Sequence, residues 1–245
     1  MASSPFALLA HDLLFLPTPQ ALEVEPYRTL FRALHADSDF CRVAFGPDFS
    51  PIIWSDEEVR DFLQKRDATL RWGKRGMGDF ALALLPENEA GHALRQFKSK
   101  TMLKTTAEDV RIVEGDEYEA YITKELLDNS DWVGYTCVRD ATTAGGSITE
   151  LYESSTQNLP PWQEMIEVRY GMDPNFRSKG IATRAAKIAM AWAEEKFGVT
   201  RFVAATEPNN HKSQKLLAKL GFEKTDEVLF GEGSAEWRRS VKSQN

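Results

Sequence analysis

Six residues, Arg177 to Ala182, lie between a strand pattern and a helix pattern, and they constrain the fold more than any other part of the chain. Before them, Met165 to Met172 alternates between two faces with a period of two, which is typical of a strand. After them, apolar residues recur every three or four positions from Ile181 to Phe197, which predicts a helix with one buried face. Gly198 suits the left-handed backbone found just beyond helices, so we expect the helix to end there.

A loop that joins a strand to the start of a helix collects unpaired backbone N–H groups, and the helix dipole adds roughly half a positive charge there. Such places bind anions. Gly180 has no Cβ, so a phosphate can approach the main chain, Ala182 keeps the next position small, and Arg177 adds a fixed positive charge. We interpret the loop as a phosphate cradle. The alternative is an ordinary helix start with a solvated basic cap.

The segment from Glu167 to Ala182 resembles the acetyl-CoA-binding core of the GNAT N-acetyltransferases. The family pattern is Arg or Gln, two residues, Gly, one residue, then Gly or Ala, and it follows a strand that often carries a glutamate where Glu167 stands. A second block matches at the family's distance, with a strand over Arg201 to Thr206 and a polar segment from Asn209 to Ser213 that leads to Phe222.

Within the superfamily, the chain is most similar to the ribosomal-protein N-terminal acetyltransferases (the RimJ and RimL type). The resemblance is specific over residues 162–222 and absent over roughly 86–131. It implies one mixed α/β domain over residues 1–245, with a twisted, mainly antiparallel sheet flanked by helices. Residues 162–222 form the acetyl-CoA-binding core of this domain, and residues 86–131 are an insertion that either shapes substrate choice or an interface or is a surface elaboration.

The implied activity is transfer of an acetyl group from acetyl-CoA to a primary amine, on a small molecule or a protein N-terminus, by direct attack in a ternary complex. No Cys or other nucleophile beside the cradle supports an acetyl-enzyme. The resemblance implies that acetyl-CoA contacts the strand end, the cradle and the next helix start, through Met172, Arg177, Ser178, Lys179, Gly180, Ile181, Ala182, Thr183, Asn210 and Ser213. Among these, the backbone N–H of Met172 would polarise the thioester carbonyl where the strand splays from its neighbour.

Glu167 matches the family's glutamate and is our candidate for the base that takes a proton from the amine. Arg169 lies two residues further on the same face. The alternative is therefore that Arg169 holds Glu167 in a structural ion pair and lowers its basicity.

The proton donor to the departing thiolate is harder to assign. Many family members have a tyrosine seven residues after the asparagine that Asn210 matches, and here that position is Leu217. Ser213 is the candidate, as in the ribosomal-protein subgroup, but serine is also an ordinary capping residue near a helix start. Asn210 also has two interpretations: the asparagine that it matches contacts the pantetheine arm in the family, and an asparagine at this position can simply cap its helix. The second functional hypothesis, favoured by Leu217, is a catalytically weak or inactive module that binds acyl-CoA.

The formal net charge of −7 and the pI near 5.3 argue against general nucleic-acid binding. No apolar stretch approaches the roughly 18 residues that span a bilayer, and no signal peptide is recognisable, so we expect a cytoplasmic protein, with the nucleus as an alternative. Cys41 and Cys137 fit neither a disulfide framework nor a metal-ligand spacing, so we expect no metal. The sequence leaves open whether the protein forms a homodimer. The NAD and ATP phosphate-loop motifs and a hydrolase Ser, His and Asp set are not found.

Periodicity and turn chemistry predict further elements along the chain. These are strands over Leu13 to Leu16, Asp79 to Leu85, Trp132 to Arg139, Val110 to Val113 and Tyr118 to Thr123, a helix over Glu25 to Leu34, a helix capped by Ser55 and Glu58, a turn over Trp72 to Gly78, a loop or loose hairpin over Ala141 to Pro161, and a terminal hairpin after Phe222 that turns at Gly231 to Gly233 and returns through Ala235 to Val241.

Overall fold

The computed structural model describes residues 4–46, 48–104, 108–143, 160–226 and 234–241. Within these ranges the strands are β1 (Phe6–Ala10), β2 (Leu13–Pro17), β3 (Asp79–Leu84), β4 (Thr101–Met102), β5 (Val110–Glu114), β6 (Asp131–Asp140), β7 (Ile166–Met172), β8 (Arg201–Thr206), β9 (Glu223–Thr225) and β10 (Ala235–Ser240). The α-helices are α1 (Thr18–Ala21), α2 (Glu25–Ala36), α3 (Ser38–Phe45), α4 (Asp56–Leu63), α5 (Gly73–Arg75), α6 (Glu89–Gln96), α7 (Asp116–Tyr121), α8 (Lys124–Asn129), α10 (Ile181–Phe197) and α11 (His211–Lys219). A π-helix, η1 (Gln64–Trp72), joins α4 to α5, and 3-10 turns cover Ala141–Thr143, Trp162–Glu164 and Pro174–Phe176.

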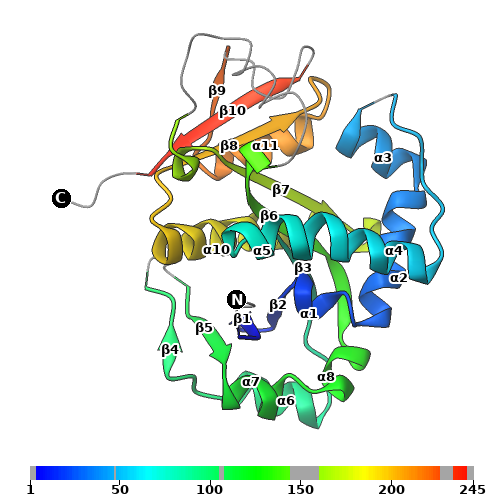
Figure 1. Cartoon of the computed structure of the whole chain (residues 1–245), viewed down its shortest axis with the longest axis vertical. Helices are drawn as coiled ribbons and strands as arrows, with labels where there is room; N and C mark the ends of the chain where they lie inside the picture. The colour runs from blue at the N-terminus through cyan, green and yellow to red at the C-terminus, as the bar shows by residue number, and fades with distance from the viewer. Residues whose placement is uncertain (1–3, 47, 105–107, 144–159, 227–233, 242–245) are drawn as a thin grey trace.

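All of these strands belong to one sheet, in the order β4-β5-β1-β2-β3-β6-β7-β8-β10-β9. The described strands pair antiparallel, except β7 and β8, which are parallel. In Figure 1 the sheet follows the long axis of the molecule, from β4 and β5 at the bottom to β9 and β10 at the top. The predicted mixed, mainly antiparallel sheet flanked by helices is confirmed.

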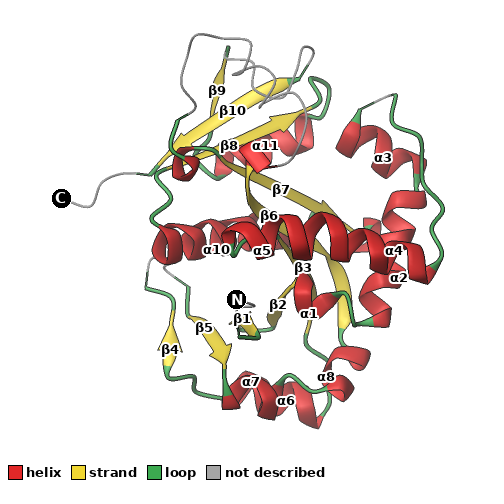
Figure 2. Ribbon diagram, viewed as in Figure 1, coloured by secondary structure: helices red, strands yellow, loops and turns green. Residues whose placement is uncertain are grey.

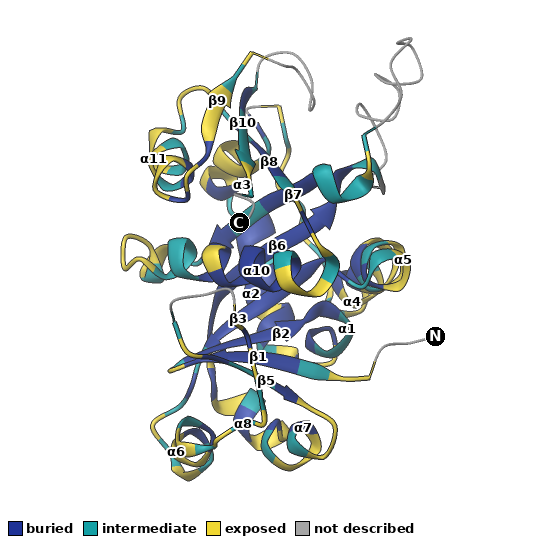
Figure 3. Cartoon of the chain, turned by 90° about the vertical axis from the view of Figure 1, so that its left-hand side faces the viewer, coloured by how far each residue is buried: buried dark blue, intermediate teal, exposed yellow. Residues whose placement is uncertain are grey.

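Successive residues of the central strands enter two different apolar clusters, one on each face of the sheet. In β2, Leu13 and Phe15 join the cluster of α10, whereas Leu14 and Leu16 join the cluster of α1 to α4. Figure 2 shows α10 on one side of the strands and α2, α3 and α4 on the other. Because both faces are covered, the central strands are buried along their length (Figure 3).

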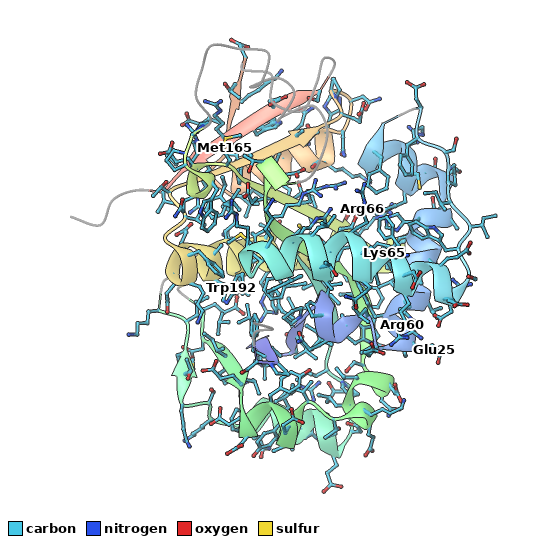
Figure 4. The ribbon with its side chains drawn as sticks, viewed as in Figure 1. Glu25, Arg60, Lys65, Arg66, Met165 and Trp192 are labelled. Atoms are coloured by element: carbon cyan, nitrogen blue, oxygen red, sulfur yellow. The ribbon has the colours of Figure 1, made fainter. Side chains whose placement is uncertain are left out.

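Aromatic rings fix α10 to the sheet. Trp192 of α10 (Figure 4) is stacked on Phe6 of β1 and meets Phe80 of β3 edge to face at a centroid distance of 5.0 Å. Such pairs stabilise a contact beyond the area that they bury. These contacts hold α10 in a set position relative to the strands.

Local sequence signals account for several helix boundaries. The predicted capping box is present, because Ser55 accepts from the backbone of Glu58 and the Glu58 side chain accepts from the backbone of Ser55. The predicted end of α10 is also present, with Gly198 in the left-handed conformation at φ +65°. The strands expected over Leu13 to Leu16, Asp79 to Leu85, Trp132 to Arg139 and Val110 to Val113 and the helix over Glu25 to Leu34 are confirmed within a few residues.

Two predictions were wrong. Tyr118 to Thr123 is not a strand: α7 covers most of it, because Tyr118 and Ile122 are buried at a helical spacing of four and Thr123 caps α8. Trp72 to Arg75 is not a turn but the end of a long helical segment, which stops at Gly76 with φ +68°.

Other predictions fall partly outside the described residues. Most of the expected loop over Ala141 to Pro161 and the hairpin turn at Gly231 to Gly233 lie there. The hairpin strands themselves are confirmed, since β9 and β10 pair antiparallel.

The segment 86–131 extends the sheet. β5 pairs with β1 over five register positions, and β4 adds to β5. Leu94 of α6, Tyr118 of α7 and Leu126 of α8 pack into the cluster that α2 and α4 also cover. The segment therefore contributes to the core. That residues 1–245 form one domain stays a prediction.

Asp67 in η1 is a buried carboxylate, 2% exposed. Arg71 donates to its Oδ1 at 2.8 Å, and the backbone N–H of Asp79 donates to its Oδ2 at 3.1 Å. Burial, followed by the charge of Asp79, raises the pKa of Asp67 to about 7, and Arg71 opposes this shift.

We expect Asp67→Asn to remove a pH dependence of stability. Because the folded pKa of about 7 exceeds the ordinary 3.8, the native chain holds a proton that the unfolded chain has lost, so the free energy of unfolding falls as the pH rises from about 4 to about 7. Urea unfolding at about pH 5 and about pH 8 measures this decline in the wild type and its loss in the variant. Asp61→Asn, at an exposed site of α4, is the control. An equal change with pH in wild type and Asp67→Asn contradicts the prediction.

Candidate active site

β7 and β8 separate after their first residues. Their register pairs are Ile166 with Phe202 and Glu167 with Val203, while β7 continues to Met172 and β8 to Thr206. On its other side β7 stays paired with β6 along its whole length. The sheet therefore opens into a V between β7 and β8, as the resemblance implies.

The open edge of β7 presents backbone donors. Asp173 N donates to Val133 O and Ala141 N donates to Met165 O, both at 2.9 Å, so odd-numbered residues of this segment exchange bonds with β6. Antiparallel pairing alternates, which turns the N–H groups of Tyr170 and Met172 toward the V.

The predicted phosphate cradle lies at the open end of the V. Gly180 is the residue before α10, with φ +81°, and no side chain caps the helix there. Ser178 also has a positive φ of 63°. No acidic residue lies in the first turn of α10, and a Cβ on Gly180 would have no neighbour within 4 Å. The first N–H groups of α10 are thus available to an anion.

Arg177 and Lys179 add positive charge to this loop and are held by neighbours. Arg177 Nε donates to Met172 O at 3.1 Å, which links the cradle to the end of β7. Lys179 Nζ lies 4.8 Å from the centre of the Phe176 ring. The sequence argument explained Gly180 by the approach of a phosphate; the left-handed backbone gives a second reason for glycine.

Asn210 and Ser213 meet at the start of α11. Asn210 Oδ1 accepts from Ser213 N at 3.1 Å, so Asn210 caps the helix, and its Nδ2 donates to Val43 O at 3.4 Å. Ser213 Oγ lies 2.6 Å from the hydroxyl of Tyr170 on β7. Leu217 is 1% exposed in the core beside α10. Sequence reasoning missed Tyr170, although it shares a strand face with Met172.

Glu167 is buried in an ion pair. Arg139 donates to Glu167 Oε2 from Nε at 2.6 Å, its Nη2 lies 2.5 Å from the same atom, and Arg169 Nε is 3.7 Å from Oε1. The ion pair between Glu167 and Arg169, which the sequence analysis gave as the alternative to a catalytic role, is thus present. Arg139, which the sequence analysis did not identify, is the nearer partner of Glu167. Arg139 faces Glu167 directly in the register of β6 and β7.

α3 covers the face of β7 that carries Arg169 and Gly171. The guanidinium of Arg169 lies 5.4 Å from the Phe45 ring, and a Cβ on Gly171 would come within 2.5 Å of the Tyr135 ring. Gly171 therefore has to be glycine for packing. The V lies between this face, covered by α2 and α3, and the opposite face, covered by α10.

A family model described as Acetyltransferase (GNAT) domain matches residues 98–223, just over half of the chain. The chain belongs to the GNAT acetyltransferase family. The match contains the V, the cradle and α11, and it reaches back into the segment 86–131, where the motifs gave no resemblance.

Curated relatives of this GNAT chain match over shorter segments. "Uncharacterized N-acetyltransferase YjdG" of Bacillus subtilis is 38% identical over 82 residues, which is 34% of this chain and 45% of the relative. Aminoglycoside N(6')-acetyltransferase type 1 of Salmonella typhimurium is 37% identical over 57 residues, 23% of this chain and 39% of the relative. The matches thus span less than half of either relative.

A solved structure shows the same fold over nearly the whole chain. Ribosomal-protein-S5-alanine acetyltransferase from Vibrio fischeri superposes with a TM-score of 0.51 at 14% identity, covering 98% of each chain. This agrees with the expected similarity to the ribosomal-protein subgroup at the level of fold. In the described part of this GNAT chain, the helices are too short or too polar to cross a membrane.

We expect Gly180→Glu to weaken binding of acetyl-CoA by at least about tenfold, because it places a carboxylate at the open N-terminus of α10. Gly198→Glu is the matched control: it has a similar φ of +65°, equally open surroundings and lies at the other end of the same helix. Calorimetric titration with acetyl-CoA compares the two. Equal affinities for both variants would rule out the cradle.

Proposed function

We propose that this GNAT protein transfers the acetyl group of acetyl-CoA to a primary amine by direct attack in a ternary complex. The observation that carries the proposal is the V between β7 and β8, which ends at the uncapped N-terminus of α10. An open strand edge and a helix start in line offer backbone donors along a path that an extended, phosphate-bearing ligand can follow.

Acetyl-CoA would supply an acetyl group activated as a thioester. The N–H groups of Gly180 to Thr183 would hold its diphosphate, with Arg177, Ser178 and Lys179 beside them. The fit rests on the open space over Gly180 and on the absence of acidic residues from the first turn of α10. Asn210, at the far side of the V, would contact the pantetheine arm with the second N–H of Nδ2, because Oδ1 caps α11 and the first N–H is donated to Val43 O.

The N–H of Met172 would polarise the thioester carbonyl. It points into the V because the bonds of its neighbours go to β6. A fixed backbone donor aimed at developing negative charge lowers a barrier by roughly 3 to 4 kcal/mol. The bond from Arg177 to Met172 O fixes the peptide that follows.

Glu167 is our proposed base, and Oε1 is the atom that would act. Arg139 binds Oε2, and among the described residues the charged partner of Oε1 is Arg169, whose Nε lies 3.7 Å away. Because the side chain is buried, the proton would reach it through water. Both guanidinium groups pair with this carboxylate, so the pH dependence of turnover in a Glu167 variant is the direct test of the role.

Direct attack agrees with the surroundings of the two cysteines. Both are free and buried. Burial, followed by the charge of Asp79, raises the pKa of Cys137 well above its ordinary value, which disfavours a thiolate nucleophile.

The second candidate function is an acyl-CoA-binding module without turnover. Leu217, in the position of the family's tyrosine and 1% exposed, is the observation that favours it. The cofactor side of the site would be the same in both functions. Turnover alone therefore separates them.

We expect release of free thiol when the protein is mixed with acetyl-CoA and a suitable amine. A panel of aminoglycosides, polyamines and peptides with free N-termini covers the acceptor classes. Aminoglycosides and peptides are tested first, because the Salmonella relative is named for the former and the Vibrio structure for a ribosomal protein. Acetyl-CoA without amine is the blank. Tight binding of acetyl-CoA with no thiol release from any amine would assign the binding module instead.

We expect Glu167→Gln to lower turnover by about 100-fold near neutral pH and by much less at alkaline pH, where more of the amine is already neutral. Steady-state rates across the pH range measure this. Glu194→Gln is the control, since it also removes a carboxylate with little exposure that is paired with an arginine, Arg239. A pH profile of the same shape as that of the wild type would rule out Glu167 as the base and leave it a structural role in the ion pair with Arg139.

A further inference from the structure

The departing sulfur needs a hydrogen-bond donor, and the family's usual one is missing. In the proposed reaction, the amine nitrogen forms a bond to the acetyl carbon and the carbon–sulfur bond breaks. The sulfur leaves with the electron pair, and one proton of the amine finally reaches it. Leu217 has no group that could assist this step.

Two hydroxyl groups meet across the V. Tyr170 lies on β7, and Ser213 lies in the first turn of α11, which follows β8. The hydroxyl of Tyr170 is 2.6 Å from Ser213 Oγ and 3.4 Å from Ser213 O, so the bond to Oγ is the principal one. This contact joins the two elements that the opening of the sheet separates.

Either hydroxyl can donate in this pair, and donation by Tyr170 requires that the phenol be protonated. Burial raises the pKa of Tyr170 to about 12, against a smaller opposite effect of Ser213, so the phenol keeps its proton at neutral pH. Ser213 N is already bonded to Asn210 Oδ1, which fixes the backbone that carries Oγ. In the described residues, Tyr170 is the hydrogen-bond partner of Ser213 Oγ. When Tyr170 donates, the serine proton has to point to another acceptor.

We propose that Tyr170 is a positioning residue for Ser213: its hydroxyl donates to Ser213 Oγ and directs the serine proton toward the thiol sulfur in the V. The pair together takes the place of the tyrosine that Leu217 replaces. Tyr170 itself keeps its proton, and the serine hydroxyl stabilises the thiolate until the amine's proton arrives. The inference rests on the proposed acetyl transfer and identifies the leaving-group side of that site.

Donation by Tyr170 also strengthens the bond that Ser213 makes. A hydroxyl that accepts one hydrogen bond becomes a better donor in the next, because the chain polarises in a low dielectric. Removing a hydrogen bond to a charged group costs roughly 10- to 100-fold in rate. The effect belongs to the step in which charge develops on sulfur and not to binding of acetyl-CoA.

The test is a double-mutant cycle on turnover with acetyl-CoA and an accepted amine. We expect Tyr170→Phe to lower kcat by about 10-fold or more with KM for acetyl-CoA unchanged, and Ser213→Ala to lower it at least as much. Tyr170→Phe should then cost less than about twofold in the Ser213→Ala background, because its effect passes through the serine hydroxyl. Ser213→Thr, which keeps a hydroxyl, should recover most of the activity.

Tyr121→Phe is the matched control. It removes a tyrosine hydroxyl in α7, where the ring packs against Phe97 at a centroid distance of 4.4 Å. The strand that α7 contacts, β5, is separated from β7 by β1, β2, β3 and β6 in the sheet order. Thermal unfolding shows whether each variant is folded.

Three outcomes overturn the inference. Wild-type kcat in Tyr170→Phe, or equal costs of Tyr170→Phe with and without Ser213, removes the positioning role while the acetyltransferase assignment stands. A wild-type chain that binds acetyl-CoA but releases no thiol overturns the assignment and this inference with it.

Discussion

The loss of pairing between β7 and β8 is the constraint on which the rest of the site depends. Two register pairs join these strands, and beyond Glu167 the backbone donors of Tyr170 and Met172 have no strand opposite them. Buried or half-buried N–H groups need partners, so such an opening is stable in a folded protein only where water or a ligand supplies them. An extended arm that carries amides can take the place of the missing strand. The gap therefore explains both what the fold leaves unsatisfied and which shape of ligand satisfies it.

The sequence predicts those elements whose signals are local. The helix that follows the cradle, its end at Gly198 and the Ser55 capping box depend on residues within one or two turns, and all three are present. The failures at Tyr118 to Thr123 and at Trp72 to Arg75 have one cause. In both, an aromatic side chain, Tyr118 or Trp72, is buried in an apolar cluster whose members come from distant parts of the chain, and this tertiary packing overrides local composition.

The same division holds in the site. The cradle is contiguous in sequence, so its position before α10 could be predicted from letters alone. Arg139 and Tyr170 could not: the first depends on the register of β6 against β7, and the second on where α11 folds back over β7. A pattern can show that Glu167 lies on a strand face with Arg169, but only the register shows that Arg139 is its nearer partner.

The two sides of the V differ in how they are built, and this difference bears on specificity. On the side of α10, short-range backbone geometry makes the site, and the same diphosphate would occupy it in any member that binds CoA. On the side of α3, the surface depends on contacts between residues distant in sequence. The guanidinium of Arg169 lies over the Phe45 ring, and Val43 O accepts a hydrogen bond from Asn210. The Tyr135 ring packs against the backbone of Gly171. A substitution in α3 thus changes this side of the V without touching the cradle. Because the family match begins only at residue 98, α2 and α3 lie outside it, and the acceptor is the part of the activity that family membership leaves free to vary.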